Sequence, residues 1–135
     1  MSEPSGLSGA CSCGSVGFQA NADLRRVLNC HCKMCRKMNG AAFSSYAVIP
    51  RKLLVLSGEE HVAEYQVTKA ARKYFCRRCG TPLFNTNARY PGACMIYWGA
   101  LGGGASATPS MNIYCESMLP WAAQISNLRR LEQGV

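Results

Sequence analysis

The chain has 135 residues, 48% of them hydrophobic and 16% charged, which excludes a disordered chain and is typical of one globular domain. Apolar stretches fall short of the roughly 20 residues of a membrane-spanning helix, and the first ten residues lack the basic and apolar regions of a signal peptide. The net charge of +8 comes from short basic pairs scattered along the chain, which does not favour a nucleic acid partner. We therefore expect a cytoplasmic protein that binds neither membranes nor nucleic acid.

Short strands separated by glycine, proline and polar turns dominate the predicted secondary structure. The predicted strands cover residues 15–22, 26–32, 41–50, 53–58, 62–68, 72–76, 82–86, 94–101 and 111–117. In the last of these, alternation places Met111, Ile113 and Cys115 on one face. Helix is expected only as a short turn after Cys35 and over residues 119–125. A flexible connection over 101–110 and a loose C-terminal end complete the prediction of one all-β domain spanning residues 1–135.

Nine cysteines in a protein of a reducing compartment indicate metal binding rather than a disulfide framework, and the odd number supports this. Seven of them fall into three clusters with ligand-like spacing: Cys11 and Cys13; Cys30, Cys32 and Cys35; and Cys76 and Cys79. The other two, Cys94 and Cys115, stand alone in apolar runs and are predicted to be small buried hydrophobic residues.

The C-x-x-C-G segment at residues 76–80 is the most specific metal motif, because its glycine tolerates the tight turn around an ion. It supplies two ligands of the four that a structural zinc ion needs. The other pair comes either from Cys11 and Cys13 or from two cysteines of the 30–35 cluster. If residues 11–13 are extended, both of their sulfurs project to one side and complete a closed site with Cys76 and Cys79.

That assignment leaves Cys30, Cys32 and Cys35 together, and three interpretations are open. Three protein ligands with a free fourth position are typical of a catalytic or substrate-binding zinc ion. A fourth residue could instead complete a structural zinc site, or the cluster could be a metal-free redox site. His31 projects away from the cysteines on either side of it, either as a proton shuttle or as a packed residue that holds the strand.

The three cysteine motifs, the "TPLF" after Cys79 and the late "NIYCESMLPW" together resemble the glutathione-dependent formaldehyde-activating enzyme family, which includes the centromere protein V domain. The match runs from about residue 9 to about residue 125. The resemblance implies a small β-tent fold shared with zinc-binding Rab-accessory proteins. It also implies two zinc ions per chain, one structural, on Cys11, Cys13, Cys76 and Cys79, and a second on Cys30, Cys32 and Cys35. Asn112 stands where many relatives carry histidine.

The resemblance further implies a carbon–sulfur lyase that reversibly joins formaldehyde and glutathione, with Cys30, Cys32 and Cys35 as the catalytic residues. Lys33, Arg36 and Lys37 beside them either dock the carboxylates of glutathione or form a solvated face. Two alternatives remain: a non-catalytic module that binds glutathione or another thiol, and a basic interaction module that, like the centromere branch of the family, binds DNA or the cytoskeleton. His61 is predicted to lie at the surface, whereas the predicted core includes the aromatic residues Phe84, Tyr97, Trp98 and Trp121.

Overall fold

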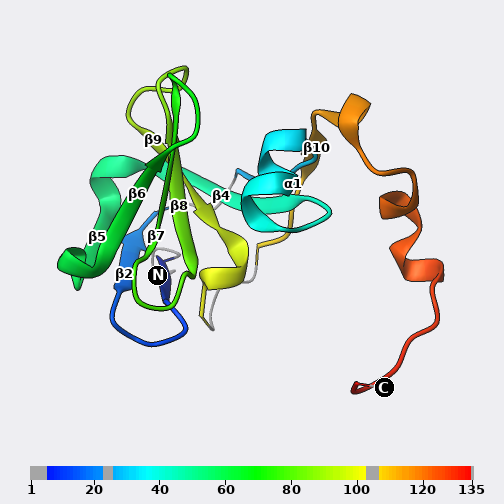
Figure 1. Cartoon of the computed structure of the whole chain (residues 1–135), viewed down its shortest axis with the longest axis horizontal. Helices are drawn as coiled ribbons and strands as arrows, with labels where there is room; N and C mark the ends of the chain where they lie inside the picture. The colour runs from blue at the N-terminus through cyan, green and yellow to red at the C-terminus, as the bar shows by residue number, and fades with distance from the viewer. Residues whose placement is uncertain (1–5, 23–25, 103–106, 135) are drawn as a thin grey trace, which may run out of the picture.

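A computed structural model describes residues 6–22, 26–102 and 107–134, and within these residues the strands form two sheets. The smaller sheet has the order β1-β2-β5 and is antiparallel throughout. Its strands are β1 (Gly6–Ala10), β2 (Gly17–Asn21) and β5 (Leu54–Ser57). Figure 1 shows β2 and β5 on the same side of the body as the N-terminal strand.

The larger sheet has the order β10-β3-β4-β9-β8-β7-β6 in the described residues. Its strands are β3 (Val27–Cys30), β4 (Ser44–Pro50), β6 (Val62–Gln66), β7 (Ala71–Cys76), β8 (Pro82–Asn87), β9 (Ala93–Tyr97) and β10 (Met111–Ile113). Neighbouring strands are antiparallel except for β10, which runs parallel to β3 and pairs Ile113 with Cys30. The predicted mainly β fold is confirmed.

Helical structure is short. The α-helix α1 (Lys33–Asn39) begins after Cys32, whose sulfur accepts a hydrogen bond from the Cys35 amide at 3.2 Å, and is capped at its other end by Gly40 with a φ of 57°. Single 3-10 turns lie at η1 (Arg51–Leu53), η2 (Glu59–His61), η3 (Trp98–Ala100) and η4 (Cys115–Ser117), followed by η5 (Pro120–Asn127). No helix among the described residues has the length and apolar character needed to cross a bilayer.

The two faces of the larger sheet bury different clusters because successive side chains of a strand point to opposite faces. Ala47 and Ile49 of β4 belong to the main core, which also takes side chains from the smaller sheet. Tyr46 of the same strand belongs to a second cluster with Leu28, Cys30, Cys35 and Tyr97. The second cluster therefore contains two of the three cysteines that come from β3 and α1.

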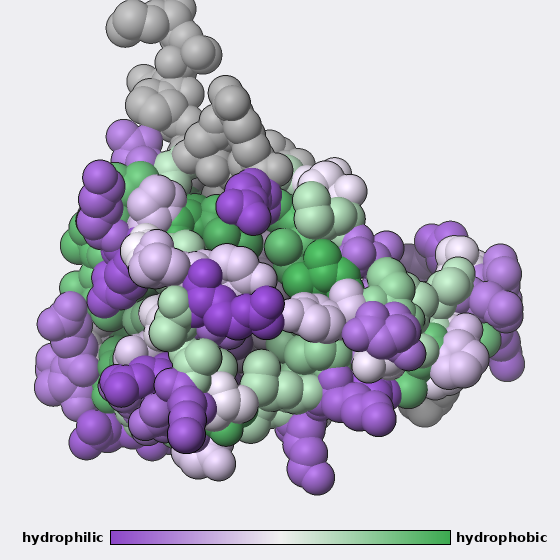
Figure 2. Space-filling view, turned by 90° about the horizontal axis from the view of Figure 1, so that it is seen from above, coloured by the Kyte–Doolittle hydropathy of each residue, from purple (hydrophilic) through white to green (hydrophobic). Residues whose placement is uncertain are grey.

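The C-terminal arm, residues 115–134, runs away from the two sheets (Figure 1). Figure 2 shows it projecting from the body, with hydrophobic and hydrophilic residues interspersed on the face in view. Its apolar side chains Trp121, Ile125, Leu128 and Leu131 are exposed, and Trp121 is 52% accessible. The prediction that Trp121 is a core residue is therefore wrong, whereas Phe84 and Tyr97 are buried as predicted.

The structure corrects several predicted boundaries. The strand predicted over 111–117 ends at Ile113, because Tyr114 has a φ of 57° and turns the chain. Cys115 consequently lies at the surface and is not the buried residue predicted, whereas Cys94 is fully buried. The strand predicted over 94–101 gives way to η3 after Tyr97. Of the predicted flexible connection over 101–110, residues 103–106 lie outside the described part of the chain.

Candidate metal centres

The first candidate centre joins two hairpin turns that are far apart in sequence. Cys11 and Cys13 lie in the turn between β1 and β2, and Cys76 and Cys79 lie in the turn between β7 and β8. Their four sulfurs all lie within 4.8 Å of one another. The structure therefore brings together the four cysteines that were predicted to form the closed site.

The two turns share one backbone design, in which amide groups point at sulfur. The Val16 amide donates to the Cys11 sulfur at 3.2 Å, and the Arg78 amide donates to the Cys76 sulfur at 3.4 Å. Each turn contains a glycine with a positive φ, Gly14 at 80° and Gly80 at 81°. The segment Cys11–Cys13 is thus a turn rather than the extended segment we expected.

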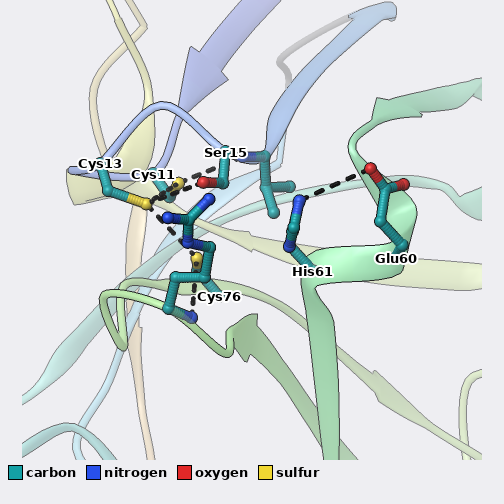
Figure 3. A network of polar contacts seen from close by, with 8 residues as sticks. Cys11, Cys13, Ser15, Glu60, His61 and Cys76 are labelled. Carbon is teal, nitrogen blue, oxygen red and sulfur yellow. Dashed lines mark hydrogen bonds and ion pairs between the residues drawn. The ribbon is translucent and has the colours of Figure 1, made fainter.

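The distances between sulfurs fit a tetrahedral ion. Zinc–sulfur bonds of about 2.3 Å place the sulfurs of a tetrahedron about 3.8 Å apart. The Cys13 sulfur lies 3.6 Å from that of Cys11 and 3.8 Å from that of Cys76, and Figure 3 shows these three sulfurs gathered in one group. Four thiolates are a donor set that suits zinc.

Hydroxyl groups beside this centre favour the thiolate forms that a metal needs. Hydrogen bonding to Thr81, whose hydroxyl is 3.2 Å from the sulfur, lowers the pKa of Cys79 to about 5. Ser15 lowers the pKa of Cys13 in the same way, across 3.2 Å (Figure 3). Burial acts in the opposite direction and raises the pKa of Cys76. His61 is partly exposed and pairs with Glu60 at 3.5 Å (Figure 3).

The second candidate centre lies where β3 meets α1. Cys30 ends β3, Cys32 caps α1 and Cys35 lies in its first turn. Their sulfurs lie within 4.8 Å of one another, and the Cys30 and Cys35 sulfurs are 3.4 Å apart. Among the described residues no further histidine, cysteine or acidic residue joins this group. Among the described residues this centre therefore has three candidate protein ligands and lacks a fourth.

The pKa values of two thiols in this centre are shifted in opposite directions. The hydrogen bond from Cys35 lowers the pKa of Cys30 to about 6. The same contact, together with burial, raises the pKa of Cys35. Of these two thiols Cys30 therefore ionises first, and a bound cation would be required to hold Cys35 as a thiolate as well.

A string of hydrogen bonds runs from Cys35 across three strands, and sequence reasoning missed it. The Tyr46 hydroxyl lies 3.3 Å from the Cys35 sulfur and accepts a hydrogen bond from Asn85 Nδ2 at 3.1 Å. The Tyr97 hydroxyl in turn donates to Asn85 Oδ1 at 2.7 Å. No sequence signal marks these residues, because strand register alone brings them to one face of the larger sheet.

His31 is buried and its ring packs 5.0 Å from that of Phe43, as expected of a packed residue. Its Nε2 lies 3.0 Å from Asn112 Oδ1, which can only accept, so Nε2 carries the proton. Its Nδ1 has no hydrogen-bond partner among the described residues. Asn112 also accepts from Asn29 Nδ2 at 3.2 Å, so it joins β10 to β3 at this corner of the sheet.

A cavity of about 440 Å³ lies beside the hydrogen-bond string, since Tyr97 lines it together with Asn39 at the end of α1. Its other described lining includes Phe43, Trp98 and small polar residues but no charged side chain, and none of the three cysteines. The predicted basic residues lie instead on α1, with Lys33 and Lys37 exposed and Arg36 partly buried. An anionic ligand would meet its cations on the helix rather than in this cavity.

Comparison with known proteins gives consistent results. A family model described as glutathione-dependent formaldehyde-activating enzyme matches residues 6–117. A Halomonas elongata protein named "Putative glutathione-dependent formaldehyde-activating enzyme" is 33% identical over 94 residues, which cover 63% of this chain and 59% of that protein. A Schizosaccharomyces pombe protein named as an uncharacterized lyase is 28% identical over 85 residues, 62% of this chain and 61% of that one. The matches thus span about three fifths of these relatives.

The fold has a counterpart among solved structures. A crystal structure of a Rhodobacter sphaeroides protein superposes with a TM-score of 0.62, covering 71% of this chain and 88% of that chain. Its sequence is 24% identical, so this likeness supports the fold alone.

Proposed function

The chain belongs to the glutathione-dependent formaldehyde-activating enzyme family, and from this premise we propose that it is a zinc-dependent carbon–sulfur lyase. Its substrate would be an aldehyde adduct of glutathione or a similar small thiol, such as S-hydroxymethylglutathione. The centre formed by Cys11, Cys13, Cys76 and Cys79 would be structural, and Cys30, Cys32 and Cys35 would hold the second ion, at which the chemistry takes place.

The observation that supports this division is the difference in ligand number between the two centres. The structural candidate has four sulfurs, which fill a tetrahedral ion, whereas the second has three and no fourth ligand among the described residues. Zinc held by three thiolates would offer one open position to a soft ligand and would lower the pKa of a thiol bound there.

The reaction is a reversible addition. The thiolate sulfur attacks the aldehyde carbon, a carbon–sulfur bond forms, and the electron pair of the C=O double bond moves to oxygen, which takes up a proton. In the lyase direction that proton leaves, the carbonyl re-forms and the carbon–sulfur bond breaks. The residues of this chain would bind and orient the thiol, and the exposed Lys33 and Lys37 on α1 would pair with the carboxylates of glutathione.

The test combines metal content with exchange kinetics. Cys32→Ser removes a soft ligand but keeps an oxygen that can cap α1, so the fold should survive. Wild type should contain two zinc ions per chain and accelerate exchange between glutathione and S-hydroxymethylglutathione, measured by magnetisation-transfer NMR. Cys32→Ser should lose one zinc ion and the acceleration, whereas Cys115→Ser, at an exposed thiol outside both centres, should keep both.

Two results would overturn the proposal. An active Cys32→Ser protein with one zinc ion would remove the second centre from the mechanism. Saturable glutathione binding by a wild-type protein that leaves the exchange rate unchanged would identify a binding module, since hemithioacetals also form without a catalyst.

A further inference from the structure

The hydrogen bonds between Tyr97, Asn85 and Tyr46 have a defined direction. Asn85 Oδ1 is a carbonyl oxygen and can only accept, so Tyr97 donates to it. Asn85 Nδ2 can only donate, so the oxygen of Tyr46 accepts from it. Tyr46 has a single proton, and the Cys35 sulfur at 3.3 Å is a partner that can accept it.

The strands hold this arrangement in place. Tyr46 of β4 is paired in register with Tyr97 of β9, and their rings lie 5.0 Å apart. Asn85 of β8 is paired with Met95 of β9, so the amide reaches both hydroxyls from the neighbouring strand. Tyr46 and Tyr97 are both buried, at 4% and 7% exposure. Water is therefore a poor substitute for either tyrosine hydroxyl.

We propose that Tyr46 is a positioning residue of the three-cysteine centre, whose hydroxyl donates a hydrogen bond to the Cys35 thiolate and draws electron density from that sulfur. This inference rests on the proposed function, because it requires a metal ion at Cys30, Cys32 and Cys35. A thiolate has no proton and can only accept, so metal binding fixes the direction that Asn85 already imposes.

The hydrogen bond has a chemical consequence. Three thiolates around a divalent ion would leave the centre with a net negative charge. An O–H group directed at Cys35 would offset part of that charge in a buried setting and would so favour the binding of a fourth sulfur. Outer hydrogen-bond partners of metal ligands commonly change metal affinity about tenfold or more when removed.

Replacing zinc with cobalt provides a direct measurement of the sulfur ligands. The wavelength of the thiolate-to-cobalt charge-transfer band depends on the energy of the sulfur electrons. The contribution of the three-cysteine centre is the part of the spectrum that Cys32→Ser removes. Tyr46→Phe should shift that part to longer wavelength and weaken metal affinity there by about tenfold. Tyr74→Phe, which changes a tyrosine stacked on Phe84 outside the string, should leave both unchanged.

A second variant tests the direction of the bond without removing Tyr46. Asn85→Asp replaces the donating amide with an oxygen that accepts, so the Tyr46 proton turns away from Cys35. The band should then shift in the same sense as in Tyr46→Phe. A spectrum of Tyr46→Phe or Asn85→Asp that matches Tyr74→Phe would overturn the proposal. If Cys32→Ser removes no cobalt signal at all, the proposed function fails first, and the two failures are thereby distinguished.

Discussion

The backbone amide of Ser12 donates a hydrogen bond to the Thr81 hydroxyl at 3.0 Å, although 69 positions separate the two residues. The contact joins the turn that carries Cys11 and Cys13 to the turn that carries Cys76 and Cys79. The same hydroxyl lies 3.2 Å from the Cys79 sulfur. Thr81 therefore aligns the two turns and supports one of the four thiolates at the same time.

Thr81→Val should weaken both effects. The Ser12 amide loses its acceptor, and the loss of this hydrogen bond should lower the free energy of unfolding by about 0.5–1.5 kcal/mol. The Cys79 sulfur also loses its neighbouring hydroxyl. The pKa of Cys79 should also rise toward its ordinary value, so zinc release on acidification should begin at a higher pH. Urea unfolding and a chromophoric zinc indicator measure the two quantities. Thr81→Ser keeps the hydroxyl and should behave like wild type; equal losses in both variants would contradict this role.

Short-range motifs explain why much of the two centres could be predicted from the sequence. Cysteines two or three positions apart must lie close together, so the C-x-C and C-x-x-C spacings already defined the clusters. Which cysteine pair joins Cys76 and Cys79 depends on how the two sheets are arranged. The spacing of the residues alone therefore allowed either Cys11 and Cys13 or two cysteines of the 30–35 cluster. The string from Cys35 to Tyr97 was missed because it joins three strands through their register, which no local pattern records.

The strand β1 was missed for a different reason. Its sequence, GLSGA, contains two glycines, and glycine has a low strand propensity. The structure explains one of them, since a Cβ at Gly9 would lie 2.2 Å from the Ala100 carbonyl oxygen and 2.5 Å from the Phe18 ring. Close packing requires glycine at position 9, and the low strand propensity of glycine explains why β1 was not predicted.

Metal removal should proceed in two stages because the two centres differ in ligand number. A chelator should first take the ion held by three thiolates while the far-ultraviolet circular dichroism remains unchanged. Loss of the second ion should coincide with unfolding, because four ligands from two distant turns tie that part of the fold together. Indicator absorbance and circular dichroism followed on one sample test the order. Simultaneous release with unfolding would assign a structural role to both centres.

Gly58 supports the first centre through its backbone. It has a φ of 72°, and a Cβ there would lie 1.9 Å from the carbonyl oxygen of Ser15, whose hydroxyl contacts the Cys13 sulfur. Gly58→Ala should therefore lower the free energy of unfolding by about 2–4 kcal/mol, combining backbone strain with displacement of the turn. Gly92→Ala is the matched control, because Gly92 has a φ of 80° but nothing within 4 Å of its Cβ position. Thermal unfolding should show a larger loss of stability for Gly58→Ala than for Gly92→Ala. Equal losses would mean that backbone strain explains the whole effect and that Gly58 does not support the turn.

Asn112 should fix the tautomer of His31. Because Asn112 Oδ1 accepts from His31 Nε2, long-range ¹H–¹⁵N NMR should find the neutral ring protonated at Nε2. Asn112→Ala removes the acceptor of both His31 and Asn29, and should lower the free energy of unfolding by about 1 kcal/mol. The His31 ring of this variant should then populate both the Nε2–H and the Nδ1–H tautomers. Asn112→Asp keeps an acceptor oxygen and should retain the Nε2–H form. A mixed tautomer in wild type would contradict this assignment.

Lys73 ties β7 to the end of α1, the helix that carries Cys35. Its ammonium group donates to Asn39 Oδ1 at 3.0 Å and to the Met38 carbonyl, and the residue is only 8% exposed. Lys73→Met leaves both acceptors without their partner and should lower the free energy of unfolding by about 1–3 kcal/mol at neutral pH. Lys69→Met, at an exposed lysine near the start of β7, should change it little.

The pH dependence of this lysine has a definite sign. Burial lowers the pKa of Lys73 below its ordinary value of 10.5, so the native protein releases this proton at a lower pH than the unfolded chain does. Between the two pKa values the unfolded chain binds more protons, and stability from this group therefore rises with pH. The stability of wild type relative to Lys73→Met should increase as the pH rises through the alkaline range toward 10.5, as measured by urea unfolding. A decrease over that interval would mean that the hydrogen bonds to Met38 and Asn39 outweigh burial and raise the pKa of Lys73 instead.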